Sequence, residues 1–193
     1  MIIEIDNISK SYGDQKVIEN FSLQIESEHS YVITGESGSG KTTLLRILLG
    51  LESADEGRIS LLGDYKYPYL NAGVVFQEDR LLEGFSAVEN VAMASRRMAK
   101  ETAREELEKL LPADQLDKPV RELSGGMKRR VAIVRACSIS SDILILDEPF
   151  TGLDNGNKEK VIQYIREKQG NNPLVITSHS LEGLEFCRNI SIK

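Results

Sequence analysis

The segment Gly35 to Thr42 reads GESGSGKT and fits the pattern G-x-x-x-x-G-K-[ST]. The apolar run Tyr31 to Thr34 precedes it, and leucines and isoleucines at helical spacing follow it until Gly50, which is placed to end a helix. The stretch therefore predicts a strand, a glycine loop and a helix in that order. In this context the loop is typical of phosphate binding, and a glycine-rich turn without function is the weaker alternative.

The residue types of this loop suit a phosphate group. Its glycines let the backbone curl so that N–H groups face the phosphate, and the following helix adds the positive end of its dipole. We expect Lys41 to reach the β- and γ-phosphates and the Thr42 hydroxyl to hold Mg²⁺. The loop residues expected to contact the nucleotide are Gly35, Glu36, Ser37, Gly38, Ser39, Gly40, Lys41, Thr42 and Thr43.

Strand and helix patterns alternate along the rest of the chain. Ile3 and Ile5 alternate with acidic residues, and Phe21 to Ile25 alternates in the same way, which predicts an antiparallel β layer. A largely helical stretch runs from about Val88 to Ala136. Apolar strands follow at residues 143–146 and 174–177, with a helical stretch between them. We expect an α/β protein with a mostly parallel sheet, interrupted by a helical subdomain.

Composition narrows the class of protein. The 193 residues suit a single domain, and the apolar runs are far shorter than the ~20 residues that cross a bilayer. The N-terminus lacks the pattern of a secretion signal, so we expect a cytosolic protein in which both cysteines remain thiols. The net charge of -6 disfavours a nucleic-acid partner, and the basic run Lys128 to Arg130 is expected to be a solvated helix face.

In the segment ILILDEPF, residues 143–150, two acidic residues follow the apolar run ILIL. Ligands gather at the carboxyl ends of strands in open α/β sheets, so we expect Asp147 to bind Mg²⁺ through water and Glu148 to polarise an attacking water. An Asp-Glu pair by itself is also compatible with a helix cap or a surface pair, which is the weaker alternative. Together with the phosphate loop it becomes a specific signal.

The segment Glu122 to Arg130, ELSGGMKRR, resembles the LSGGQ signature of ABC ATPases, and it lies before the Asp-Glu strand as it does in that family. The resemblance implies one ABC ATPase domain over residues 1–193 with a phosphate-loop NTPase core. The α/β core would comprise residues 1–76 and 136–193, and the helical subdomain about 77–135. Met127 replaces the usual glutamine, but the Ser and Gly residues are intact, so hydrolysis is still expected.

The same resemblance implies a dimer with ATP and Mg²⁺ as its cofactors. In such proteins the signature of one subunit closes over ATP held by the other, so Ser124, Gly125 and Gly126 are expected to contact the γ-phosphate across the interface. A hydroxyl, exposed amides and a helix N-terminus suit that role. Asp154, in TGLD, resembles the acid that lies along this interface.

Three further residues match the family pattern in sequence order. Tyr12 resembles the aromatic residue that stacks on adenine, although a lone tyrosine near a turn is as often ordinary packing. Gln77 resembles the glutamine that touches Mg²⁺ or the attacking water and reports nucleotide occupancy to the membrane subunit. His179 resembles the histidine that hydrogen-bonds the γ-phosphate. Glu148, His179 and Gln77 are thus the expected catalytic residues, and Thr42, Gln77 and Asp147 the expected metal ligands.

The resemblance also implies partners. We expect a homodimer, or a heterodimer with a related ATPase subunit, that is peripheral on the inner face of the cell membrane and energises separate transmembrane permease subunits. Leu81, Leu82, Phe85 and Val88 are candidates for a docking groove, with core packing as the alternative. A soluble ABC-type ATPase of DNA repair or chromosome maintenance is the alternative function, a non-enzymatic nucleotide sensor stays conceivable, and the direction of transport stays open.

Overall fold

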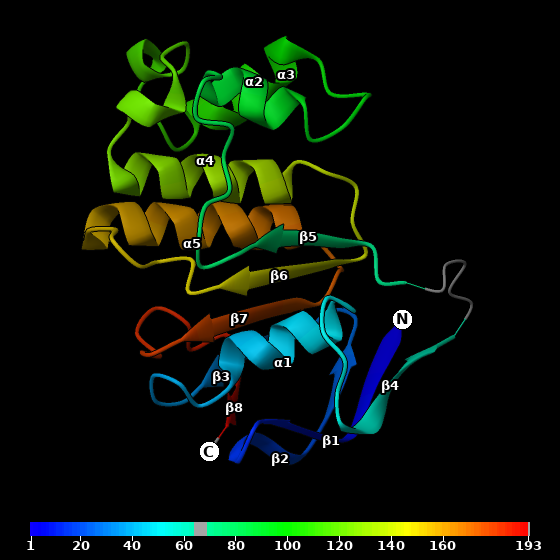
Figure 1. The fold of residues 1–193 in the computed structure, drawn as a ribbon. Helices are drawn as coiled ribbons and strands as arrows, with labels where there is room; N and C mark the ends of the chain where they lie inside the picture. The colour runs from blue at the N-terminus through cyan, green and yellow to red at the C-terminus, as the bar shows by residue number, and fades with distance from the viewer. Residues whose placement is uncertain (64–68, 193) are drawn as a thin grey trace. The chain divides into compact units, whose positions relative to one another are not determined.

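The computed structural model describes residues 1–63 and 69–192, which divide into two compact units. Figure 1 shows the elements of both in chain order. Unit 1 contains Met1–Ala72, Asp142–Asp147 and Asn171–Lys193, and unit 2 contains Gly73–Ser141 and Glu148–Gly170. Unit 2 therefore includes the helix after the Asp-Glu pair, which the sequence pattern assigns to the α/β core.

The N-terminal part of unit 1 is an antiparallel sheet with the strand order β2-β1-β4. It consists of β1 (Ile2–Tyr12), β2 (Gln15–Glu26) and β4 (Glu56–Leu62). Ile3 lies opposite Ile25, and both side chains are fully buried. The alternation of apolar and polar residues therefore places one face of this sheet in the core, which confirms the antiparallel β layer.

A parallel sheet forms the rest of unit 1, with the order β6-β7-β3-β8. Its strands are β3 (Ser30–Thr34), β6 (Ile143–Asp147), β7 (Leu174–Ser178) and β8 (Arg188–Ser191). The three strands β3, β6 and β7 are almost entirely buried, as is typical of parallel strands covered on both faces. Helix α1 (Lys41–Leu48) follows β3, and its leucines join the same core.

Unit 2 is mainly helical. After β5 (Ala72–Val75) it contains α2 (Ala87–Ala92), α3 (Lys100–Glu108), α4 (Gly125–Cys137) and α5 (Asn155–Gln169). Helix α2 packs on α3 and α4, and α4 also packs on α3 and α5. Among the residues that the structure describes, no helix is both long and apolar enough to cross a membrane.

The basic run at the start of α4 is not the solvated face that the sequence analysis expects. Arg129 is 7% exposed and Arg130 9%, whereas the side chain of Lys128 is 25% exposed. Helix α4 is enclosed by α2, α3 and α5, so both guanidinium groups lie inside unit 2. Their donors bond to backbone carbonyls there, which offsets the cost of burying charge.

Candidate active site

The phosphate loop joins β3 to α1 and folds closely around its lysine. Lys41 is 6% exposed, and its ammonium donates to the carbonyl oxygens of Gly35 and Glu36, both at 2.8 Å. Gly40 precedes the helix with a φ of 90°. A Cβ there would lie 2.8 Å from the carbonyl oxygen of Val17, so the loop needs glycine at this position. The loop thus holds a positive charge beside curled backbone, as phosphate binding requires.

The other loop residues lie around this lysine. Glu36, Ser37 and Gly38 are exposed at the tip of the loop, while Ser39 and Thr43 are half-buried. The Ser39 hydroxyl oxygen is inaccessible to solvent and forms no hydrogen bond with any residue that the structure describes. A buried hydroxyl of this kind has a donor to offer to a ligand.

Asp147 ends β6 and meets two hydroxyl groups. Its carboxylate accepts a hydrogen bond of 2.8 Å from the Thr42 hydroxyl and one of 2.6 Å from the Thr177 hydroxyl. Asp147 is 3% exposed and Thr177 fully buried. These bonds hold the carboxylate of Asp147 against the first turn of α1, so the structure brings together Thr42 and Asp147, two of the three predicted metal ligands.

The oxygen atoms of Thr42 and Asp147 are suitable ligands for Mg²⁺. This ion prefers oxygen ligands and is usually bound by one or two carboxylates together with waters and substrate phosphates. Thr42 and Asp147 offer a hydroxyl and a carboxylate at the carboxyl end of a strand, next to the phosphate loop. The residues present are therefore of the kind that would hold a magnesium–nucleotide complex.

His179 and Glu148 each follow directly after a parallel strand. In β7, Ser178 pairs with Thr34 of β3, so His179 emerges at the same sheet edge as the phosphate loop, and it is exposed. Glu148 is half-buried and has a φ of 50°. A left-handed backbone is uncommon for a residue with a side chain, and residues strained in this way cluster at active sites and ligand clamps.

Tyr12 lies at the end of β1 with about half of its surface exposed. Its hydroxyl donates to a carboxylate oxygen of Glu52, and the ammonium of Lys10 lies 5.6 Å from its ring centroid. The hydrogen bond fixes the hydroxyl end of the side chain and leaves ring surface exposed. The ring is therefore open to a stacking partner.

The signature residues lie at the N-terminus of α4, in unit 2. Ser124 caps the helix by accepting a hydrogen bond from the Met127 amide at 3.3 Å, and both Ser124 and Gly125 are exposed. A Cβ on Gly126 would lie 3.1 Å from the carbonyl oxygen of Gly152. This close approach favours glycine at position 126, whereas Ser124 and Gly125 face solvent.

Asp154 caps α5 and connects to the signature through Arg130. Its carboxylate accepts the Asn157 amide at 2.9 Å, a bond that lowers the pKa of the Asp154 carboxyl. The guanidinium of Arg130 donates to the Gly126 carbonyl at 3.2 Å and to the Asn157 side chain at 3.0 Å. Arg130 therefore joins the signature turn to the segment that carries Asp154.

Gln77 comes two residues after β5, and its side chain is exposed. Its backbone carbonyl accepts a hydrogen bond from Arg129 at 2.5 Å. Sequence reasoning assigns no role to Thr177, Arg129 or Arg130. One sequence signal could have indicated that the two arginines are buried. They stand directly before the apolar run VAIV, in what is predicted to be a helix.

The predicted site residues are thus divided between the units. Unit 1 holds Tyr12, the phosphate loop, Asp147 and His179, and unit 2 holds Gln77, the signature, Glu148 and Asp154. The strand, loop and helix of unit 1, together with an acid at the end of another strand of the same parallel sheet, define a phosphate-loop nucleotide-binding protein.

Comparisons with known proteins narrow this class. The family model described as ABC transporter matches residues 18–151. The glutamine transport ATP-binding protein GlnQ of Bacillus subtilis is 36% identical over 91% of this chain and 80% of its own length. The Nod factor export ATP-binding protein I of Cupriavidus metallidurans is 34% identical over 99% of this chain and 67% of its own length.

A solved structure gives the same result. The ATP-binding cassette MJ0796, in a dimeric post-hydrolysis state bound to ADP and Pi, has a TM-score of 0.86 and 28% identity over 99% of this chain and 94% of its own. The chain therefore belongs to the ABC transporter family, and its domain is an ABC ATPase, which binds and hydrolyses ATP. This confirms the resemblance and the fold class expected from the sequence. The roles of the individual site residues stay predictions.

Proposed function

We propose that this ATPase works as a dimer on the inner face of the cell membrane and energises transport by separate membrane-spanning permease subunits. The observation that carries the proposal is the exposed N-terminus of α4, where Ser124 and Gly125 present a helix end and a hydroxyl to solvent. Such a surface suits the phosphates of ATP bound to a second subunit. The dimeric state described for the MJ0796 cassette supports this arrangement.

Hydrolysis requires positioning and charge neutralisation more than covalent chemistry. Lys41 neutralises the β- and γ-phosphates, and Ser124 of a second subunit completes the cage. Glu148 accepts a proton from the attacking water, and the water oxygen forms a bond to the γ-phosphorus. The bond between the γ-phosphorus and the oxygen that bridges it to the β-phosphate breaks. His179 and Gln77 orient the γ-phosphate and the water. Thr42 and Asp147 would hold Mg²⁺, which would supply further positive charge to the phosphates.

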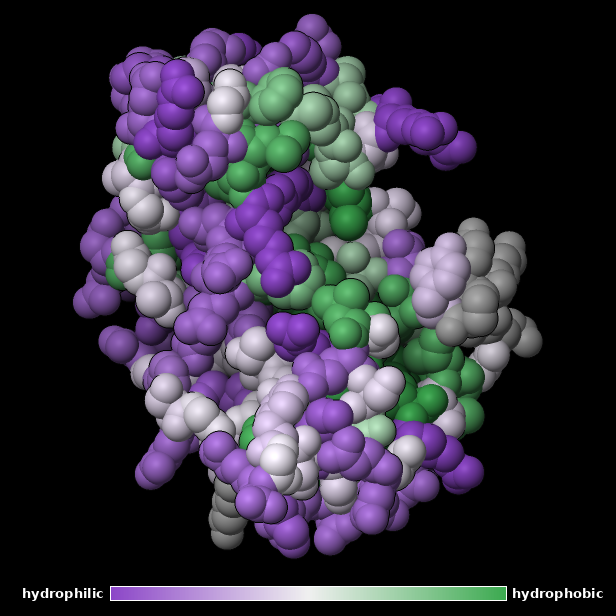
Figure 2. Space-filling model, viewed as in Figure 1, coloured by the Kyte–Doolittle hydropathy of each residue, from purple (hydrophilic) through white to green (hydrophobic). Residues whose placement is uncertain are grey.

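A surface of unit 2 suits a permease partner. Leu82, Phe85 and Met93 are 49%, 46% and 50% exposed. Figure 2 shows apolar side chains reaching the surface in its upper part, where Figure 1 places α2 and α3. Of the four predicted groove residues, Val88 does not belong to this surface because it is 3% exposed and packs in the core, and Leu81 is half-buried.

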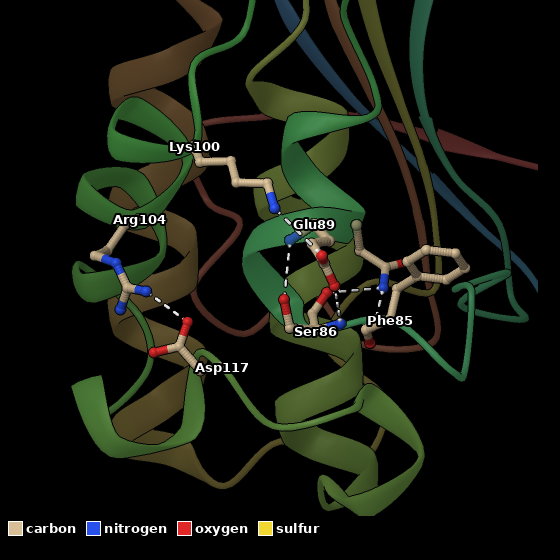
Figure 3. Close-up of polar contacts among 7 residues, drawn as sticks. Phe85, Ser86, Glu89, Lys100, Arg104 and Asp117 are labelled. Atoms are coloured by element: carbon tan, nitrogen blue, oxygen red, sulfur yellow. Dashed lines mark hydrogen bonds and ion pairs between the residues drawn. The ribbon is translucent and has the colours of Figure 1, made fainter.

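The loop that presents Leu82 and Phe85 is held in place by hydrogen bonds. The buried Asn90 side chain accepts a bond from the Leu82 amide and donates to the carbonyls of Leu82, Phe85 and Ser86. Figure 3 shows the capping box between Ser86 and Glu89, which starts α2. The exposed apolar side chains therefore stand on a fixed backbone, as a docking surface requires.

Co-purification tests this proposal. We expect the Leu82→Asp/Phe85→Asp double variant to lose a multi-spanning membrane protein that the unmodified chain retains in detergent, because charge replaces the apolar contact. Leu51→Asp is the matched control, since Leu51 is 55% exposed in unit 1. Mass spectrometry identifies the partner, and ATP turnover checks that each variant is folded. Equal retention by all three proteins would contradict docking at this surface.

A further inference from the structure

We propose that Arg129 is a positioning residue for Gln77. Its guanidinium donates from Nη1 to the Phe76 carbonyl at 2.8 Å and from Nη2 to the Gln77 carbonyl at 2.5 Å. Its Nε lies 3.1 Å from the Asp79 carboxylate. Two nitrogens of one planar group therefore hold two successive carbonyls of the segment that carries Gln77, while the third lies within ion-pair distance of Asp79, a geometry that Lys cannot reproduce.

Arg135 continues this arrangement further along α4. It donates to the carbonyl oxygens of Asp79 at 2.9 Å and Arg80 at 2.8 Å. The Arg80 guanidinium in turn lies 3.8 Å from the centroid of the Phe76 ring. Residues 76–80 are thus tied to α4 by two arginines and closed on themselves by a cation–π contact.

These bonds determine the conformation because the segment has no regular secondary structure of its own. Strand β5 ends at Val75 and α2 begins at Ala87, so the carbonyls of residues 76–80 need partners outside a helix or strand. The arginines of α4 supply partners for four of these carbonyls, those of residues 76, 77, 79 and 80. Gln77 is exposed, so its side chain projects to solvent from a backbone held by Arg129.

The contacts of Arg129 bear on ATP hydrolysis through Gln77, and this step rests on the proposed function. Helix α4 begins with the signature residues Gly125 and Gly126, so one helix positions both the signature and Gln77. The docking loop around Leu82 and Phe85 follows the same segment. A displacement of α4 would therefore move Gln77 and the signature together, and contact with a permease would reach both through residues 76–80.

A double-mutant cycle separates positioning from general stability. Arg129→Lys keeps a positive charge beside Asp79 but loses the paired bonds to the two carbonyls. We expect kcat for ATP to fall about tenfold with KM within about twofold, as loss of a charge-assisted hydrogen-bond pair allows. In a Gln77→Ala background the same substitution should cause no further loss of kcat, because residues that act as one unit are not additive.

Hydrogen exchange gives a readout that does not depend on turnover. We expect the amides of residues 76–80 to exchange faster in Arg129→Lys than in the unmodified chain. Arg104→Lys is the matched control, because Arg104 pairs with Asp117 on the surface of unit 2 at 2.5 Å (Figure 3). It should leave kcat and exchange in residues 76–80 unchanged.

Two results would overturn the proposal. One is an equal loss of kcat from Arg129→Lys with and without Gln77, which would show a merely structural role. The other is unchanged exchange in residues 76–80. If the unmodified chain does not hydrolyse ATP or does not retain a permease, the proposed function fails instead, and the exchange experiment still decides whether Arg129 holds the segment.

Discussion

Lys41 is the cation of the phosphate loop, and its ammonium holds the Gly35 and Glu36 carbonyls. We predict that Lys41→Ala abolishes tight ATP binding, because the β- and γ-phosphates lose the charge placed to neutralise them. A nucleotide titration followed by calorimetry measures this. Lys16→Ala, which removes an exposed lysine of β2, should bind ATP normally. Unchanged affinity in Lys41→Ala would mean that the loop does not hold the phosphates.

Tyr12 combines an exposed ring with a hydroxyl that is bonded to Glu52. We predict that Tyr12→Ala weakens ATP binding by about 1–3 kcal/mol, the range for stacking on aromatic residues. Tyr12→Phe keeps the ring and loses the hydroxyl, so it should retain most of the affinity. Titrations with ATP and GTP compare the variants, and GTP should be tolerated. If Tyr12→Ala binds both nucleotides as the unmodified chain does, the tyrosine serves packing alone.

At the scale of elements, the loop before α2 depends on Asn90. We predict that Asn90→Ala lowers the free energy of unfolding by about 1–3 kcal/mol, because partly buried backbone groups of Leu82, Phe85 and Ser86 lose their hydrogen-bond partner. Urea denaturation measures this, with Asn171→Ala, an exposed asparagine of unit 1, as the control. ATP affinity should persist, since the phosphate loop lies in the other unit. Equal stability of the two variants would contradict the role given to Asn90.

The elements themselves were largely predictable, but the surroundings of their side chains were not. Glycines around Lys41 and helical spacing after it locate α1, because both are local signals. The burial of Arg129 depends on the helices that enclose α4, which are distant in sequence. A basic run by itself predicts a solvated helix face, and only the helices packed around α4 show that this one is buried. The same reason explains why Val88, predicted in a docking groove, lies in the core.

At the scale of the whole molecule, the proposed shared site, in which the signature of one subunit contacts ATP bound to the other, predicts a dimer controlled by ATP. Glu148→Gln should keep ATP binding and lose about 10²–10⁴-fold in hydrolysis, as expected for a general base. The amide is nearly isosteric but takes no proton from water, and the loss of charge reduces repulsion near the γ-phosphate. Dimers should therefore accumulate with ATP and not with ADP. Light scattering measures the mass in solution.

The signature supplies the control for this experiment. Ser124→Arg in the same background should prevent the ATP-induced dimer, because a bulky side chain then occupies the exposed start of α4. A Glu148→Gln protein that binds ATP and stays monomeric would contradict the shared site. A dimer that persists with Ser124→Arg would place the interface away from the signature.

By itself the sequence determined the phosphate loop, the α/β class and the order of Lys41, Ser124, Asp147 and His179 along the chain. These depend on short patterns whose backbone geometry is set by neighbouring residues. Only the tertiary structure decided that Thr177 bonds to Asp147, that Asn90 holds the loop before α2, and that the α4 arginines turn inward. Those contacts join residues from separate elements, and packing rather than local pattern brings them together.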